Sequence, residues 1–263
     1  MTIQGLSVDV HGDLKDRTAV CIHGFLMSRK IWHAALESVD EGIGVVTYDL
    51  RGAGRSEVGT GQYTMESYVD DLFAVMDELQ IHETVLCGHD LGAYVAFRAL
   101  QREPRRVAGI IACNALAAPI STPDVLWWSD AVRQVQHTSL KRFVRNYVPT
   151  LFAEDSKIQE GSPYEELLAD AGNMDPVGVV GQILAYLSRT ETRHVVEETA
   201  APILAMTGEL DDYVTHEALL RLALSAPGLD VLRVPETGHT VPAEHPRYLG
   251  DALSRFVRRV AEL

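Results

Sequence analysis

The stretch Val85-Leu86-Cys87-Gly88-His89-Asp90-Leu91-Gly92-Ala93 decides the fold of this chain. A short apolar run ends in Gly-x-Asp-x-Gly and continues directly into the helix-forming residues 94–100. This order is typical of a nucleophile elbow, in which a strand turns sharply into a helix and one side chain projects from the turn. We expect both glycines to be required, because a Cβ atom at either position would clash across so tight a turn. The alternative is an ordinary turn in which Asp90 is only the helix N-cap.

Apolar runs and helical patterns alternate on both sides of this turn. An edge strand is expected within residues 1–10, and Ser28 is a plausible N-cap for an amphipathic helix. The remaining elements are strands at 18–22, 43–48, 107–112, 202–207 and 229–234, and helices at 63–79, at 216–224 and from Ala243 onward. This order predicts an α/β fold, a mostly parallel twisted sheet flanked by helices on both faces.

The alternation stops at Asn114 and resumes after about Thr199. The intervening residues contain no convincing buried strand, only helical patches at 125–136, 140–151, 164–171 and 177–188. Because this insertion lies between two strands of one sheet, we expect a cap over the C-terminal edge of the sheet, where ligands bind in open α/β folds. The predicted division is a core domain of residues 1–114 and 200–263 and a helical cap of residues 115–199. No Pro/Gly/Ser-rich linker supports an independent helical domain.

The composition limits the partners. The chain has 263 residues, 46% of them apolar, and a net charge of −14 from 37 acidic and 23 basic residues. It has no basic cluster beyond short runs, which argues against nucleic acid and anionic membranes as partners. Strongly anionic substrates are also disfavoured, although one local arginine could overrule the overall field. We therefore expect a small-molecule substrate.

Cysteine usage and the N-terminus point to the cytoplasm. Cys21, Cys87 and Cys113 each lie in or beside an apolar run, as buried thiols of a reducing compartment do. No cysteine or histidine spacing suggests zinc, and we expect no signal peptide, because a charged segment followed by an apolar one is missing at residues 1–5. No apolar run approaches the roughly 20 residues that span a bilayer. We predict a cytoplasmic monomer or homodimer without a metal or other cofactor.

Residues at two further predicted strand ends could act together with Asp90, one as a base and the other as the carboxylate that orients it. His239 stands in a Gly-His turn after the last predicted strand, and Asp211 lies in the loop after the strand that ends at Thr207. A carboxylate there can hold the imidazole in one tautomer and stabilise its charged form. Asp212 is the adjacent alternative, and the spacing favours Asp211.

Four separated motifs now stand at predicted strand ends: His23-Gly24-Phe25, Asp49-Leu50-Arg51-Gly52-Ala53-Gly54-Arg55-Ser56, the elbow, and Gly208-Glu209-Leu210-Asp211 paired with Gly238-His239. With these motifs in this order, the chain resembles proteins of the α/β-hydrolase fold over essentially its whole length. The resemblance implies a cap after the sixth strand and an Asp90-His239-Asp211 triad. It also implies an oxyanion hole formed by the backbone N–H groups of Phe25 and Leu91. A helix N-terminus at Leu91 would favour negative charge there.

An aspartate at the elbow is similar to that of epoxide hydrolases and haloalkane or haloacid dehalogenases. A carboxylate is already ionised at neutral pH and needs no base for its own attack. It suits displacement at saturated carbon, which leaves an alkyl ester of the enzyme, and a histidine can then activate water to hydrolyse that ester. We therefore expect hydrolysis of an epoxide or a carbon–halogen bond in a small, largely apolar substrate.

The chain departs from those enzymes at two positions. Leu26 stands where they usually carry proline, and Leu91 stands where haloalkane dehalogenases place a halide-binding tryptophan. In the cap, Trp127 or Trp128 could bind a halide, and a tyrosine could protonate an opening epoxide. Packing within the cap is the more ordinary role of each of these residues. The predicted pocket residues are His23, Trp127, Trp128, Tyr147 and Tyr186.

Two other functions stay open. Outside the elbow the chain is more similar to the ester, lactone and carbon–carbon bond hydrolases of this fold, as in His23-Gly24-Phe25 without a following proline. In such a lineage Asp90 would be an acid/base in a lyase, cyclase or isomerase step of specialised metabolism. The third possibility is a non-catalytic binder that keeps the cap pocket. Retention of both His239 and Asp211 counts against it.

Overall fold

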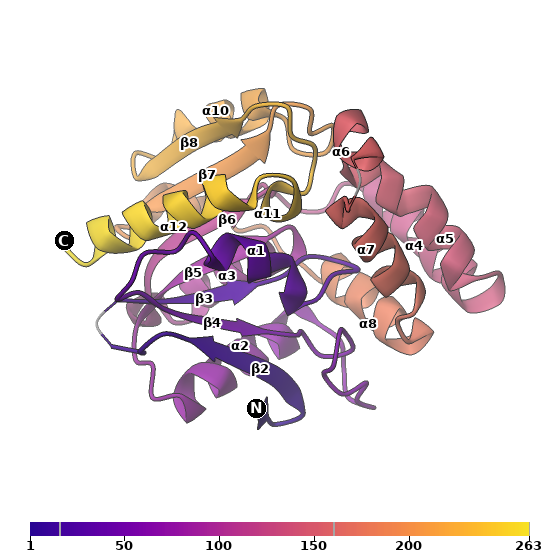
Figure 1. The fold of residues 1–263 in the computed structure, drawn as a ribbon, viewed down its shortest axis with the longest axis horizontal. Helices are drawn as coiled ribbons and strands as arrows, with labels where there is room; N and C mark the ends of the chain where they lie inside the picture. Colours follow the sequence, from indigo (N-terminus) through magenta and orange to yellow (C-terminus); the bar gives the residue numbers. More distant parts are fainter. Residues whose placement is uncertain (16, 160, 263) are drawn as a thin grey trace.

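The computed structural model describes residues 1–15, 17–159 and 161–262, and its strands form one sheet in the order β1-β2-β4-β3-β5-β6-β7-β8 (Figure 1). The first two pairings, β1 with β2 and β2 with β4, are antiparallel, and all the others are parallel. The strands are β1 (Thr2–Ile3), β2 (Leu6–His11), β3 (Thr18–Ile22), β4 (Gly44–Tyr48), β5 (Thr84–His89), β6 (Val107–Cys113), β7 (Ile203–Gly208) and β8 (Leu229–Val234). The predicted α/β fold class is confirmed.

The N-terminal edge differs from the single strand expected over residues 1–10. It consists of β1 and β2, joined by a reversal at Gln4 and Gly5, whose φ angles are 47° and 83°. A glycine adopts such a positive φ without a steric penalty, and this permits the tight turn. The weak alternation of this segment therefore belongs to a hairpin.

Helices cover both faces of the sheet (Figure 1). Alternate residues of a strand point to opposite faces. Val20 and Ile22 of β3 accordingly pack with α2 and α3, whereas Ala19 and Cys21 pack with α1 and α12. The core helices are α1 (His33–Leu36), α2 (Met65–Glu78), α3 (Leu91–Arg102), α10 (His216–Ala223), α11 (Val241–Glu244) and α12 (Pro246–Val260), with short 3₁₀ helices η1 (Arg29–Trp32) and η2 (Pro104–Arg106). Among the described residues, no helix has both the length and the apolar character needed to cross a bilayer.

The chain between β6 and β7 is helical, and α4 to α8 gather at one end of the sheet (Figure 1). Its helices are α4 (Thr122–His137), α5 (Leu140–Tyr147), η3 (Val148–Leu151), α6 (Glu154–Ile158), α7 (Pro163–Gly172), α8 (Pro176–Leu187) and α9 (Arg193–Glu198). The helix expected over 140–151 changes to a 3₁₀ turn where Pro149 removes a backbone donor. Helices α6 and α9 were not predicted, because five or six residues show no clear period. The assignment of residues 115–199 to a cap subdomain stays a prediction.

Helix α8 contacts the core through a glycine pair and a buried glutamine. A Cβ atom on Gly178 would lie 2.1 Å from the carbonyl oxygen of Gly52, so the two backbones meet directly. Gln182 is fully buried, and its Oε1 accepts from the N–H of Leu26 at 3.1 Å. Its Nε2 donates to the carbonyl of Gly52 at 3.4 Å. These contacts hold α8 over the loops that follow β3 and β4.

Candidate active site

The elbow joins β5 to α3 at Asp90, whose φ of 47° and ψ of −113° are unusual for a residue with a side chain. A Cβ atom on Gly88 would lie 2.5 Å from Ala93, and one on Gly92 would lie 2.0 Å from the carbonyl oxygen of Ile22. Both glycines are therefore sterically required, as predicted. Asp90 occupies the N-cap position of α3, but its side chain makes no capping hydrogen bond, so side-chain capping does not explain an aspartate here.

The carboxylate of Asp90 has two differently placed oxygens. Oδ2 accepts a hydrogen bond of 3.0 Å from the N–H of Phe25, the first of the two predicted oxyanion-hole donors. Oδ1 lies 4.0 Å from Nε2 of His239, too far for a direct hydrogen bond. The second predicted donor, the N–H of Leu91, belongs to the first residue of α3, where backbone donors have no partner within the helix.

His239 and Asp211 meet at the ends of β8 and β7. The Nδ1 atom of His239 lies 3.0 Å from both carboxylate oxygens of Asp211. Asp211 Oδ1 also accepts from the N–H groups of Tyr213 and Val214, at 2.8 and 3.0 Å. Asp212 is exposed. The structure thus brings Asp211 to the imidazole, and Nδ1–H donates so that Nε2 faces Asp90.

The pKa values of this pair are displaced in opposite directions. Burial acts to lower the pKa of His239, but the charge and hydrogen bond of Asp211 outweigh it, so this pKa lies above its ordinary value. Burial acts to raise the pKa of Asp211, but the charge and hydrogen bond of His239 outweigh it, so this pKa is lowered. Both shifts favour an imidazolium beside a carboxylate. His239 is therefore suited to accept a proton from water and hold it.

Three polar residues that sequence reasoning missed support this arrangement. Asn114 Nδ2 donates to Asp211 Oδ2 at 2.8 Å. His89 Nε2 donates to the carbonyl of His239 at 2.8 Å, and burial lowers the pKa of His89 to about 4. Glu244 Oε1 accepts from the N–H groups on both sides of His239, those of Gly238 and Thr240. The position of Asn114 directly after a strand was an available signal, whereas no sequence pattern indicates the contact of Glu244.

His23 does not line the cavity next to Asp90 and His239, so its assignment to the substrate pocket is wrong. The side chain is completely buried. Its Nδ1–H donates to the carbonyl of Gly24 at 2.8 Å, and its Nε2 accepts from the N–H of Leu50 at 2.9 Å. Both ring nitrogens are thus used to bridge the loops after β3 and β4, and none is left for a ligand.

The other four predicted pocket residues border a cavity of about 700 Å³ that is also lined by Asp90 and His239. Trp127 and Trp128 stack edge to face at 4.7 Å, so they line the cavity and pack at once. Trp127 is 47% exposed at the rim, and Trp128 is buried. The lining residues that sequence reasoning missed include Tyr94, Phe143, Asn146, Arg189 and Tyr213. The lining thus combines a cluster of aromatic rings with polar side chains, which suits a small ligand that has an apolar body and one or more polar groups.

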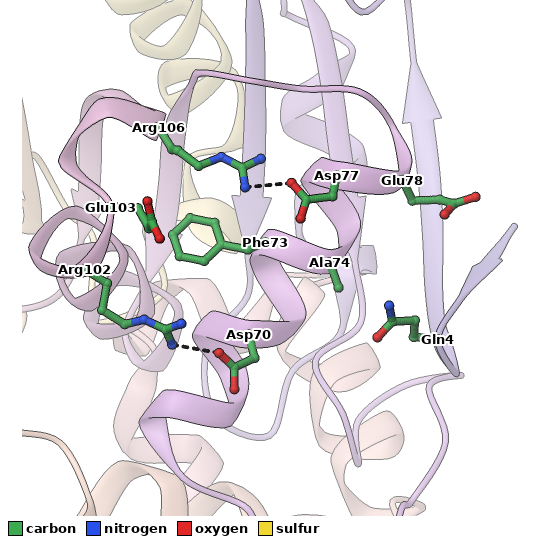
Figure 2. A pocket seen from close by; sticks show the side chains of 9 residues that line it. All are labelled: Gln4, Asp70, Phe73, Ala74, Asp77, Glu78, Arg102, Glu103 and Arg106. Carbon is green, nitrogen blue, oxygen red and sulfur yellow. Dashed lines mark hydrogen bonds and ion pairs between the residues drawn. The ribbon is translucent and has the colours of Figure 1, made fainter.

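A second hollow lies beside α2 and η2 and shares no lining residue with the Asp90 cavity (Figure 2). Two arginines there are already paired: Arg102 with Asp70 at 2.8 Å and Arg106 with Asp77 at 2.6 Å. Both guanidinium groups also lie over the ring of Phe73. Their charges are satisfied within the chain, so we assign this hollow no catalytic role. Within the described ranges, no group of three or more His, Cys, Asp or Glu side chains is arranged to hold a metal ion.

Comparisons of the sequence and of the structure with known proteins both find proteins of the alpha/beta hydrolase fold. The family model for the alpha/beta hydrolase fold matches residues 20–246. A thermophilic esterase from Thermogutta terrifontis superposes with a TM-score of 0.91 at 26% identity, covering 97% of this chain and 93% of that one. The enol-lactonase from Burkholderia xenovorans LB400 gives 0.88 at 20% identity, over 97% and 98%. A pimeloyl-acyl-carrier-protein methyl ester esterase of Edwardsiella ictaluri is 26% identical, over 91% and 93%.

Proposed function

Since the chain belongs to the α/β-hydrolase fold family, we propose that it is a hydrolase whose nucleophile is Asp90. The substrate is a small, largely apolar molecule with an epoxide or a carbon–halogen bond. The reaction passes through an alkyl ester of Asp90, which His239 and Asp211 hydrolyse.

One observation carries this proposal: the two oxygens of Asp90 have different environments. Oδ2 is held by the N–H of Phe25 at 3.0 Å, whereas Oδ1 is not within hydrogen-bond distance of His239. An alkyl-ester mechanism needs this division, because one oxygen must attack while the other becomes the ester carbonyl oxygen. A carbonyl oxygen at the position of Oδ2 would already lie in the oxyanion hole when the ester is hydrolysed.

In the first step Oδ1 forms a bond to the substrate carbon, and the bond from that carbon to the epoxide oxygen or halide breaks. A halide leaves as the anion. An epoxide oxygen requires a proton, and the hydroxyl groups of Tyr147 and Tyr186 at the cavity wall are the candidates. Burial raises the pKa of both tyrosines well above the ordinary value, so each keeps its proton until an alkoxide develops.

In the second step His239 Nε2 takes a proton from water, and the hydroxide attacks Cγ of the Asp90 ester. The tetrahedral oxyanion lies at the Oδ2 position, beside the N–H groups of Phe25 and Leu91. Collapse expels the alcohol, which leaves with the former Oδ1 and takes the proton from His239. Asp90 then loses the proton that the hydroxide brought, to the tyrosine that protonated the epoxide oxygen or, after loss of a halide, to water. Removing one hydrogen-bond donor of the oxyanion hole typically slows the reaction about 10²–10³-fold.

A single turnover in ¹⁸O-water, followed by mass spectrometry of the peptide that contains Asp90, tests this route. The screen uses terminal epoxides and short haloalkanes to find a compound that the enzyme consumes. We expect ¹⁸O in the Asp90 carboxylate, because water attacks the ester carbonyl. Label in the product alone would refute the alkyl-ester route.

A second candidate function has Asp90 as an acid/base in a lyase, cyclase or isomerase step. The similarity to an esterase and an enol-lactonase supports only the ester- and lactone-hydrolase lineage of this candidate, because neither name implies displacement at saturated carbon. A substrate converted without incorporation of water oxygen would support this candidate. A ligand that raises the melting temperature and is recovered unchanged would instead support a non-catalytic binder.

A further inference from the structure

The side chain of Arg189 lines the Asp90 cavity just beyond the end of α8. Two of its guanidinium nitrogens, Nε and Nη1, are buried and hydrogen-bond to no residue that the structure describes. Buried polar groups in folded proteins are nearly always hydrogen-bonded, and an unpaired buried charge is costly. The charge of Arg189 is therefore not satisfied within the described chain.

Aromatic stacking accounts for only part of the environment of this arginine. Its Cζ atom lies 4.1 Å from the ring centre of Tyr186 and 4.6 Å from that of Tyr94. Such contacts stabilise the positive charge. They do not supply the oxygen acceptors that the N–H groups need. These contacts hold the guanidinium in place and cover Nε and Nη1, so a ligand in the cavity would reach this arginine at its third guanidinium nitrogen, Nη2.

Other partly buried arginines of this acidic protein do have carboxylate partners. Arg29 pairs with Asp9 and Asp49, and Arg51 pairs with Asp71. The chain has 37 acidic residues, so partners for arginine are plentiful. No described carboxylate forms an ion pair with Arg189, which separates this residue from Arg29 and Arg51.

The distance to the reacting centre follows from Tyr94. The N–H of Tyr94 donates to the carbonyl of Asp90 at 3.3 Å, so the tyrosine lies one turn along α3. Because Arg189 stacks on the Tyr94 ring, the guanidinium lies on the order of 10 Å from Asp90, about one helical turn and one ring contact. A ligand that reaches both groups therefore has several bonds between its reacting carbon and its anionic group.

We propose that Arg189 binds a carboxylate of the substrate at the end of the cavity remote from Asp90. The substrate class is then an aromatic or apolar carboxylic acid whose reactive carbon lies several bonds from the acid group, and this assignment rests on the proposed function of the cavity. One guanidinium balances one negative charge. The net charge of −14 further disfavours a dianion such as a phosphate ester.

Calorimetric binding of unreactive probes tests the proposal. The probes are 4-phenylbutanoate, its neutral amide 4-phenylbutanamide, and the dianionic 3-phenylpropylphosphonate. We expect the wild-type protein to bind the acid at least about tenfold more tightly than the amide, since charge-assisted hydrogen bonds are the stronger ones. The phosphonate should bind more weakly than the acid. Equal affinity for acid and amide, or a preference for the phosphonate, would overturn the assignment.

Variants then identify the residue responsible. Arg189→Gln should abolish the preference for the acid, and Arg189→Lys should retain part of it. The matched control is Arg133→Gln, which removes one charge from an exposed arginine that pairs with Asp130 on α4. The control should leave the preference intact. An acid preference that survives in Arg189→Gln contradicts the proposal, and if that variant does not fold, the wild-type comparison of acid and amide still decides.

The outcome is separable from that of the ¹⁸O experiment, because binding of these probes makes and breaks no bond. An acid preference without label in Asp90 would refute the nucleophile and keep the carboxylate site. Label in Asp90 without an acid preference would support the nucleophile and refute the carboxylate site.

Discussion

Two charged groups at the cavity, Asp211 and Arg189, differ in how their polar atoms are satisfied. On the core side, Asp211 accepts hydrogen bonds from His239, Asn114 and two backbone N–H groups. On the cap side, the lining is aromatic, and Arg189 has two buried donors without an acceptor in the described chain. A fully bonded acid–base pair keeps one geometry, whereas an arginine without a carboxylate partner can still pair with a charged ligand. We infer that the core determines the chemistry and the cap selects the substrate.

The largest expected effect is on turnover, and it comes from a substitution on the core side of the cavity. His239→Gln removes the base and leaves Asp90 unchanged, so attack on the substrate should proceed while ester hydrolysis stalls. We expect turnover to fall about 10²–10⁴-fold, and the mass of the protein to increase by that of the epoxide or by that of the haloalkane less the hydrogen halide. Intact-protein mass spectrometry after incubation measures this.

Absence of any adduct on Asp90, with a compound that the wild type consumes, would count against the alkyl-ester route. The matched control is His245→Gln, a nearby histidine that does not line the cavity. It should give near-normal turnover and no adduct.

A pair of cap substitutions tests whether the cap lining is also structural. Trp128 is buried and lies edge to face on Phe25 at 4.9 Å, whereas Trp127 is half exposed at the rim. Trp128→Ala should lower the free energy of unfolding by about 3–5 kcal/mol, because it leaves a void at the contact with the core. Trp127→Ala should cost less than about 1.5 kcal/mol. Urea denaturation measures both, and equal losses would contradict this division of the lining.

The smallest expected effect is a pH dependence of the ester-hydrolysis step, in which His239 acts. The pKa of His239 lies above its ordinary value, so the protonated imidazole persists to a higher pH than usual. It cannot accept a proton from water, and ester hydrolysis should slow about tenfold per pH unit below that pKa. Formation of the Asp90 ester should not follow the same curve. Rapid-quench measurements of the two steps separate them.

The same raised pKa has a consequence for stability. A group whose pKa is higher in the folded state than in the unfolded state stabilises the fold below the unfolded pKa, and this contribution is lost as pH rises through the folded pKa. The difference in unfolding free energy between the wild type and His239→Gln should therefore shrink as pH rises through the folded pKa of His239. A constant difference would show that His239 does not titrate in this way.

Much of the core was predictable because its signals are local. Apolar runs marked β3 to β8, and Gly88 and Gly92 marked the elbow through steric requirements within a few residues. The loops that follow parallel strands must meet at one edge of a sheet. That rule is sufficient to bring Asp90, Asp211 and His239 together, although their catalytic roles stay predictions.

The sequence by itself determined the sheet, its covering helices and the three strand-end residues, since periodicity and glycine sterics act between near neighbours. Tertiary structure alone decided the rest. It turned His23 inward to bridge two loops, placed Asn114 on Asp211, and left Arg189 stacked on two tyrosines without an acceptor. Each of these outcomes depends on which residues far along the chain come into contact, and packing decides that rather than any local pattern.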